Sequence, residues 1–161
     1  MNKQTVTVIV TTIVTVLVLV VAFVLLMPII GPRYLHPMMM GQQSAPTDLD
    51  MTTSHLSDNS MFLVSWTSDP SVPPLNQIHT WTLHVETADG QPVDDAEITV
   101  DGGMPQHGHG LPTSPQVTQN LGNGDYLVEG MKFQMQGWWE VRFNINAGGQ
   151  TDTITFNFTM E

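Results

Sequence analysis

The sequence contains no cysteine in 161 residues. Without a thiolate, the chain cannot build a zinc ribbon, an iron–sulfur cluster, a disulfide bond or a cysteine nucleophile. The absence of cysteine also argues against a blue-copper electron-transfer centre, which uses a cysteine thiolate. Methionine is therefore the only soft metal ligand that the chain can offer, and it occurs eleven times.

Basic residues are nearly as scarce, with four lysines and arginines against fifteen acidic residues. All of the acidic residues lie at or beyond Asp48, where the only bases are Lys132 and Arg142, so this part carries a net charge of −13. Such a surface argues against nucleic acid and anionic lipid as partners. It favours cations or a basic partner, or it serves only to keep the protein soluble.

Motifs of catalysis are missing as well. The sequence has no G-x-S-x-G elbow, no H-E-x-x-H pair and no phosphate-binding loop. Histidine and acidic residues are present, but nothing pairs a nucleophile with a base. We therefore expect a protein that is not an enzyme.

A long apolar run opens the chain. Thr5 to Met27 contains no charged residue, and at about 1.5 Å per residue a helix of this length spans roughly 34 Å, enough to cross a bilayer core. We expect residues 1–30 to be a single-span anchor in the inner (cytoplasmic) membrane, with a cleaved signal peptide as the alternative. Because Lys3 precedes the run, the positive-inside rule predicts a periplasmic or extracytoplasmic C-terminal domain.

Residues 31–58 are predicted to form a flexible linker. Proline, glycine, serine, threonine and glutamine dominate there, and the apolar residues follow no helical or strand periodicity. The linker contains His36, His55 and a run of methionines at 38–40. Such a tract could hold soft metal transiently. Alternatively, the methionines could be adaptable apolar contacts near the bilayer surface.

From residue 59 to residue 161 the pattern is that of short strands. Apolar and polar residues alternate in "HTWTLHVE", "AEITVD", "WWEVRFNI" and "TITFNFTM", and "NGD" is typical of a hairpin turn. Short alternating strands without a helix predict an all-β domain, an antiparallel two-sheet β-sandwich. The residues expected between its sheets are Trp81, Leu83, Val85, Ile98, Val100, Trp139, Val141, Phe143, Phe156 and Phe158.

The segment "MPQHGHGLP", from Met104 to Pro112, is the main candidate for chemistry. In an extended backbone, residues two apart project to the same side, so His107 and His109 could present two imidazoles to one ion. Imidazole is a good ligand for copper or zinc, and a nearby thioether selects Cu(I). The alternative is an ordinary turn with solvated histidines.

A second group of candidates lies outside this loop. Met135 belongs to "MKFQM", which offers thioethers from elsewhere in the chain, and His79 is on the inward face of its strand. We predict that His107 and His109 bind one Cu(I) ion, with a thioether from Met104 or Met135 and with His79 as a further candidate ligand. A lone inward histidine is, however, more often a hydrogen-bonded core residue.

The stretch "LNQIHTWTLHVETADGQPVDDAEITVDGGMPQHGHGLPTSPQV", followed by "GDYLVEGMKFQMQGWWEVRFNI", resembles the YtkA-like proteins, a group related to FixH. The resemblance covers about residues 75–158. It implies an immunoglobulin-like sandwich, often tethered by an N-terminal membrane segment, and a role in handling copper or assembling membrane oxidases. The matching positions are His79, Met104, His107, His109, Met135 and Trp139, of which Trp139 looks like support for the site.

Two classes of function follow. In the first, the chain is a membrane-anchored copper-binding protein, a metallochaperone that stores, shields or delivers Cu(I) to an acceptor protein. In the second, it is a non-catalytic structural or assembly subunit of a membrane metalloenzyme or oxidase complex. Copper bound by the domain would favour the first, and co-purification with a large complex without metal would favour the second.

Overall fold

A computed structural model describes residues 2, 4, 11–23 and 46–161. The chain divides into two units, Met1–Gly41 and Gln42–Glu161, each of which is considered by itself. In the first unit, residues 11–23 are helical, and the Thr15 hydroxyl donates to the carbonyl of Thr11 (2.8 Å), one turn earlier. Within the described residues, no helix has the length and hydropathy that a membrane span requires. Residues 1, 3, 5–10 and 24–30 of the predicted anchor lie outside the described residues, as do residues 31–45 of the predicted linker, which include His36 and the 38–40 methionines.

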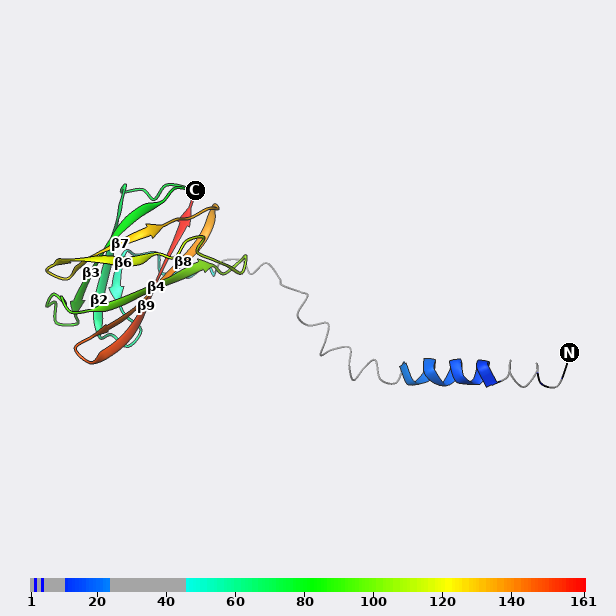
Figure 1. The fold of residues 1–161 in the computed structure, drawn as a ribbon. Coiled ribbons are helices and arrows are strands. Elements are labelled where there is room, and N and C mark those ends of the chain that lie inside the picture. Colours follow the sequence, from blue (N-terminus) through cyan, green and yellow to red (C-terminus); the bar gives the residue numbers. More distant parts are fainter. Residues whose placement is uncertain (1, 3, 5–10, 24–45) are drawn as a thin grey trace. The chain divides into compact units, whose positions relative to one another are not determined.

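The described residues of the second unit form nine strands in two antiparallel sheets (Figure 1). One sheet has the order β1-β2-β3-β7-β6 and the other the order β5-β4-β8-β9. The strands are β1 (Ser54–Leu56), β2 (Phe62–Asp69), β3 (His79–Thr87), β4 (Glu97–Met104), β5 (His109–Gly110), β6 (Gln116–Gly122), β7 (Asp125–Met131), β8 (Gly137–Ala147) and β9 (Gln150–Met160). The predicted antiparallel β-sandwich is confirmed.

The core follows from the period-two alternation. In β3, Trp81, Leu83 and Val85 are fully buried while the residues between them are half-buried, as expected for a strand with one face on the core. Strand β8 repeats the pattern, and Trp81 packs against Phe158 of β9, in the other sheet, with ring centroids 5.7 Å apart. Aromatic rings from both sheets therefore fill the space between them.

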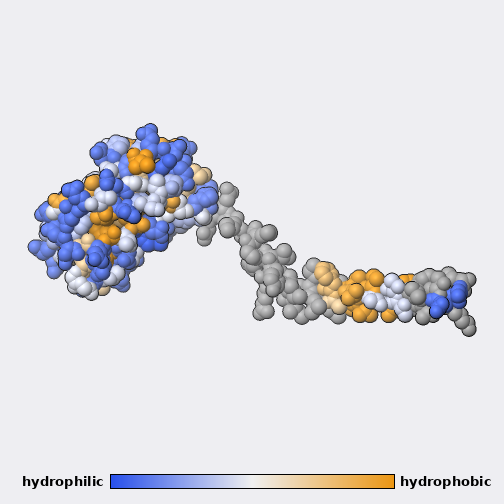
Figure 2. Space-filling model, viewed as in Figure 1, coloured by the Kyte–Doolittle hydropathy of each residue, from blue (hydrophilic) through white to orange (hydrophobic). Residues whose placement is uncertain are grey.

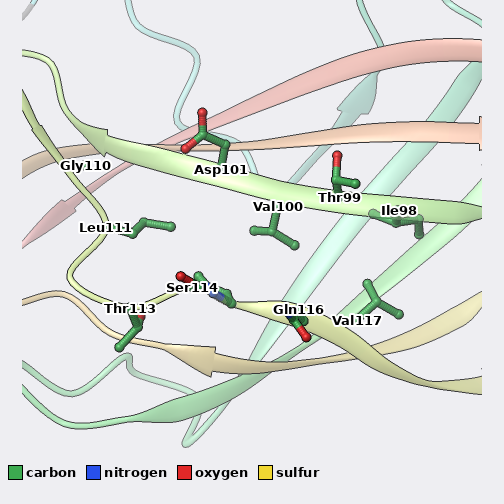
Figure 3. Close-up of a pocket in the computed structure, with 11 residues that line it drawn as sticks. Ile98, Thr99, Val100, Asp101, Gly110, Leu111, Thr113, Ser114, Gln116 and Val117 are labelled. Carbon is green, nitrogen blue, oxygen red and sulfur yellow. The ribbon is translucent and has the colours of Figure 1, made fainter.

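Three residues of the predicted core differ from expectation. Ile98, Val100 and Phe158 are only partly buried. In the case of Ile98 and Val100 the reason is their position: β4 lies near the open edge of its sheet, and both side chains point into an open space between β4 and the segment that leads into β6 (Figure 3). An apolar strip is accordingly exposed near β4 and β6, between hydrophilic borders (Figure 2).

The β6–β7 hairpin has the turn that its sequence predicts. Asn123 and Gly124 both have positive φ, 58° and 79°, which suits the right-handed twist of paired strands. A Cβ on Gly124 would lie 2.5 Å from the carbonyl oxygen of Val85, so the close approach to β3 also requires glycine.

The domain begins earlier than residue 59. Residues 54–56, which fall in the predicted linker, form β1 and pair with β2. His55 does not belong to a free tract, because its ring lies 4.6 Å from that of Phe156. Asp152 at the start of β9 secures the same region by accepting hydrogen bonds from the Ser57 hydroxyl (2.6 Å) and the Asn59 side chain (2.8 Å).

Candidate metal centre

The two candidate imidazoles sit on a tight hairpin between β4 and β5. The His107 amide donates to the carbonyl of Met104 (3.0 Å), which closes a turn, and Gly108 adopts a φ of 63°. A left-handed residue at this point suits glycine and brings the chain back towards β4. As a result, the side chains of His107 and His109 both stand exposed to solvent.

The rings of His107 and His109 are 6.1 Å apart between centroids and nearly parallel, with an interplanar angle of 10°. With metal–nitrogen bonds of about 2.0 to 2.1 Å, two imidazoles on opposite sides of one ion have ring centres about 6 Å apart. Because both rings are exposed, rotation about their side-chain bonds can turn a nitrogen of each towards a shared ion. The spacing predicted from the sequence is therefore compatible with one bound ion.

Met104 is at the base of the same hairpin, but its side chain is buried. Met104 pairs with His109 across the two strands, yet it has no exposed surface. Its methyl group lies against Gly137, where a Cβ would be only 3.1 Å from it. The thioether of Met104 therefore packs under the start of β8 and is not presented to solvent beside the imidazoles.

Met135 lies in the loop that connects β7 and β8, two residues before Gly137. Met135 is 38% exposed, in contrast to the buried Met104, and its carbonyl oxygen accepts a hydrogen bond from the Trp139 indole (2.9 Å). Trp139 is fully buried, so this bond fixes the loop to the core. The contact between Met104 and Gly137 brings the base of the hairpin against the loop that carries the accessible thioether.

His79 is placed differently from the loop histidines. It is 5% exposed, and its Nε2 accepts a hydrogen bond from the Trp81 indole (3.2 Å) while its Nδ1 lies 3.2 Å from the carbonyl of Gln77. Burial lowers the pKa of His79 below its ordinary value, more than the bond to Gln77 raises it. Both nitrogens of a neutral ring are thus engaged, and metal binding by His79 would leave the Trp81 indole without its acceptor.

Acidic residues that we had not identified from the sequence surround His109. A hollow of about 420 Å³ is lined by His109, Asp101, Glu140 and Arg142, among others. They come together through the register of β4 and β8, which pairs Asp101 with Arg142 and Gly103 with Glu140. No local motif carries that register, so inspection of the loop alone could not find them. The carboxylates make the surroundings of His109 favourable for a cation.

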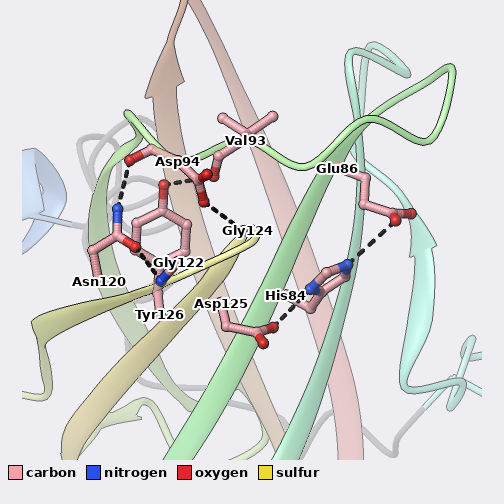
Figure 4. A network of polar contacts seen from close by, with 9 residues as sticks. All are labelled: His84, Glu86, Val93, Asp94, Asn120, Gly122, Gly124, Asp125 and Tyr126. Atoms are coloured by element: carbon pink, nitrogen blue, oxygen red, sulfur yellow. Dashed lines mark hydrogen bonds and ion pairs between the residues drawn. The ribbon is translucent and has the colours of Figure 1, made fainter.

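Elsewhere in the domain, His84 pairs with carboxylates on the outer face of the five-stranded sheet (Figure 4). Its Nδ1 is 2.7 Å from Asp125 and its Nε2 is 3.3 Å from Glu86, so the two carboxylates lie at opposite nitrogens of one ring. Across the residues that the structure describes, no three histidine, cysteine, aspartate or glutamate side chains form a group that could hold a metal ion.

The sequence profile of the YtkA-like family matches residues 64–144, just over half of the chain. The chain belongs to the YtkA-like family. The matched residues run from β2 into β8 and include the whole hairpin with His107 and His109. For this YtkA-like chain, the family assignment agrees with the resemblance seen in the sequence.

No curated protein matches this YtkA-like chain. Among solved structures, a DUF4426 family protein from Pseudomonas aeruginosa PAO1 is similar, with 12% sequence identity, a TM-score of 0.49, and coverage of 67% of this chain and 94% of that one. The ZirS C-terminal domain is similar over 71% of this chain and 75% of that one, with 18% identity and a TM-score of 0.35. At these levels neither similarity extends to function.

Proposed function

We propose that this chain is a non-catalytic, membrane-anchored extracytoplasmic protein that binds one Cu(I) ion through His107 and His109 and stores, shields or delivers it. The observation that carries the proposal is the pair of exposed, nearly parallel imidazoles whose centroids are 6.1 Å apart on one hairpin. That separation suits two ligands on one ion.

Methionine completes the donor set. The base of the hairpin packs against Gly137, and the neighbouring loop offers the partly exposed thioether of Met135. Imidazole with thioether is a ligand set that favours Cu(I) over harder ions, and it includes no thiolate. Copper held in this way can pass to an acceptor protein with stronger ligands, which fits delivery better than permanent storage.

The setting of the site supports a cation as cargo. Asp101 and Glu140 line the hollow beside His109, together with Arg142, whose guanidinium lies 3.9 Å from the Glu140 carboxylate. At a domain charge of −13, the surface attracts cations at long range. Placement in the inner membrane, with the domain on the periplasmic side, rests on the apolar run from Thr5 to Met27 and on Lys3 before it.

The test is a Cu(I) affinity measurement on the purified full chain, in competition with a chromophoric Cu(I) chelator. The double variant His107→Ala/His109→Ala should bind at least about tenfold more weakly, because both nitrogen ligands are lost. His84→Ala is the control: it also removes an imidazole, but a half-buried one that belongs to the Asp125 pair. Its affinity should equal that of the unmodified chain.

Equal affinities for the double variant and the unmodified chain would overturn the proposed site and leave the linker histidines and methionines as the place of binding. Purification in a large membrane complex without bound copper would instead favour the structural or assembly role. Copper analysis of the material purified from membranes distinguishes these outcomes.

A further inference from the structure

An open groove separates the edges of the two sheets where β4 faces the segment that leads into β6. The groove has a volume of about 550 Å³ (Figure 3). Four apolar side chains point into it: Ile98 and Val100 from β4, together with Leu111 and Val117. All four are only partly buried, although they pack against the core. The sandwich is therefore incomplete along this edge.

The edge is open because the chain leaves β4 early. After the hairpin, the chain runs back along β4 only as far as Leu111, whose amide donates to the carbonyl of Gly102 (3.0 Å). No further backbone hydrogen bond joins the described residues 112–117 to β4. The chain then crosses to the other sheet and begins β6 at Gln116.

The backbone of β4 beyond this point is free on the groove side. In an antiparallel strand, alternate residues direct their N–H and C=O groups to the same side. Because the carbonyl of Gly102 points to the groove side, the backbone N–H and C=O groups of Val100 and Ile98 do so as well. Among the described residues, no strand pairs with β4 there, since β5 pairs only with Gly103 and Met104. Natural proteins usually cover or charge such an edge, because it can accept another strand.

The charges beside the edge limit what can pair with it. A strand added to β4 would place alternate side chains in the groove, and the others on the outer face beside Glu97, Thr99 and Asp101. Glu97 and Asp101 are exposed and acidic. Pairing of β4 with a second copy of itself, centred on Thr99, would set Glu97 opposite Asp101 twice, and like charges directly opposite are destabilising. A basic strand avoids this repulsion.

We propose that β4 receives an extended, basic segment of a partner protein by strand addition. The backbone groups of Ile98 and Val100 bind the partner's main chain. Small apolar side chains of the partner fill the groove against Val117, and lysine or arginine side chains between them pair with Glu97 and Asp101. Asp101 also lines the hollow beside His109, but the groove includes neither histidine, and strand addition to β4 requires no bound copper.

The experiment uses the full chain in detergent micelles and a short synthetic peptide in which lysine and valine alternate. Amide hydrogen exchange is followed with and without the peptide. The Ile98 and Val100 amides should exchange about tenfold more slowly or better when the peptide is bound, as expected for strand addition. An otherwise identical peptide of glutamate and valine should give no protection, because its charges repel Glu97 and Asp101.

Two substitutions on adjacent residues provide the matched comparison. Val100→Gln puts a polar side chain into the groove, whereas Thr99→Gln puts the same side chain on the outer face of the same strand. Val100→Gln should weaken peptide binding by about tenfold or more, and Thr99→Gln should change it by less than about twofold. Thermal unfolding of both variants confirms that each is folded.

Several results would overturn the proposal. They are an absence of protection at Ile98 and Val100, equal binding of the glutamate peptide, or equal losses in the two variants. Protection that appears without peptide and grows with protein concentration would mean that a second copy occupies the edge, which also contradicts a basic partner.

Discussion

The methyl group of Met104 lies against Gly137, so closely that a Cβ at Gly137 would be 3.1 Å from it. This contact joins the hairpin that carries His107 and His109 to the loop that carries Met135. Two features favour glycine at the start of β8. The first is the contact with Met104, and the second is the φ of 120° at residue 137, which residues with a side chain rarely adopt. The geometry of the candidate site therefore depends on a residue that has no ligand atom.

Gly137→Ala should lower the free energy of unfolding by about 1–3 kcal/mol, because it combines an unfavourable φ with pressure on Met104. Gly148→Ala is the control. Gly148 also has a positive φ, 57°, but a Cβ there would meet nothing within 4 Å. Urea denaturation of both variants measures the difference, and equal losses would show that the contact with Met104 contributes nothing.

Met135→Leu should weaken Cu(I) binding on the order of tenfold and leave Zn(II) binding unchanged, because a thioether is a soft ligand and the imidazoles remain. Met104→Leu should leave both affinities unchanged, since the Met104 side chain is buried and leucine nearly conserves its volume. Competition titrations with each metal test the pair. A loss confined to Met104→Leu would mean that the buried thioether, and not the exposed one, reaches the ion.

His79→Leu should cost about 1–3 kcal/mol of stability, because it leaves the buried Trp81 indole N–H without an acceptor. Cu(I) affinity should not change. Burial holds the pKa of His79 below 6.5 in the folded chain, so as the pH falls His79 is protonated in the unfolded chain before it is protonated in the folded one. The free energy of unfolding therefore decreases as the pH drops below about 6.5. Denaturation at a series of pH values should show that this dependence is smaller in the variant; a drop in copper affinity would restore His79 as a ligand.

His84 should show the opposite dependence on pH. Partial burial lowers the pKa of His84, but the bonds to Asp125 and Glu86 outweigh it, so the net pKa is above 6.5. The stabilisation from the charged ring is therefore fully present below about pH 6.5 and is lost as the pH rises through the raised pKa. His84→Gln should be less stable than the unmodified chain in mild acid and nearly equal to it in mild alkali. Asp125→Asn should behave in the same way, and a deficit that does not vary with pH would contradict the ion pair.

Asp152→Asn should lower stability at neutral pH by about 2 kcal/mol. Burial raises the pKa of Asp152, but hydrogen bonds from Ser57, Asn59 and the Thr153 amide outweigh it and lower the pKa to about 2. The stabilisation is therefore present above the ordinary value of 3.8 and is lost as the pH falls towards about 2. Asp58→Asn makes the same change at an exposed residue of the adjoining turn and should have little effect. Chemical denaturation at neutral pH and in acid measures the stability of both variants. Equal losses of stability in Asp152→Asn and Asp58→Asn would contradict the prediction.

Local periodicity was enough to predict most of the fold. Alternation in β3 and β8 placed Trp81 and Trp139 in the core, and "NG" predicted the β6–β7 turn, because each depends on residues adjacent in the chain. Ile98 and Val100 show the limit of this reasoning. They have the alternation of core residues, but their burial depends on whether another strand covers the edge, and the chain leaves β4 after Leu111.

The sequence by itself determined the chemistry that the chain can offer: imidazole and thioether without thiolate, an acidic domain, and two histidines spaced to share one side of an extended loop. Only the tertiary structure decided which of these groups are accessible. It buries Met104 and His79, exposes Met135, and brings Glu140 beside His109 through the register of β4 and β8. Accessibility depends on contacts between segments distant in sequence, such as that between Met104 and Gly137, and no local pattern encodes those contacts.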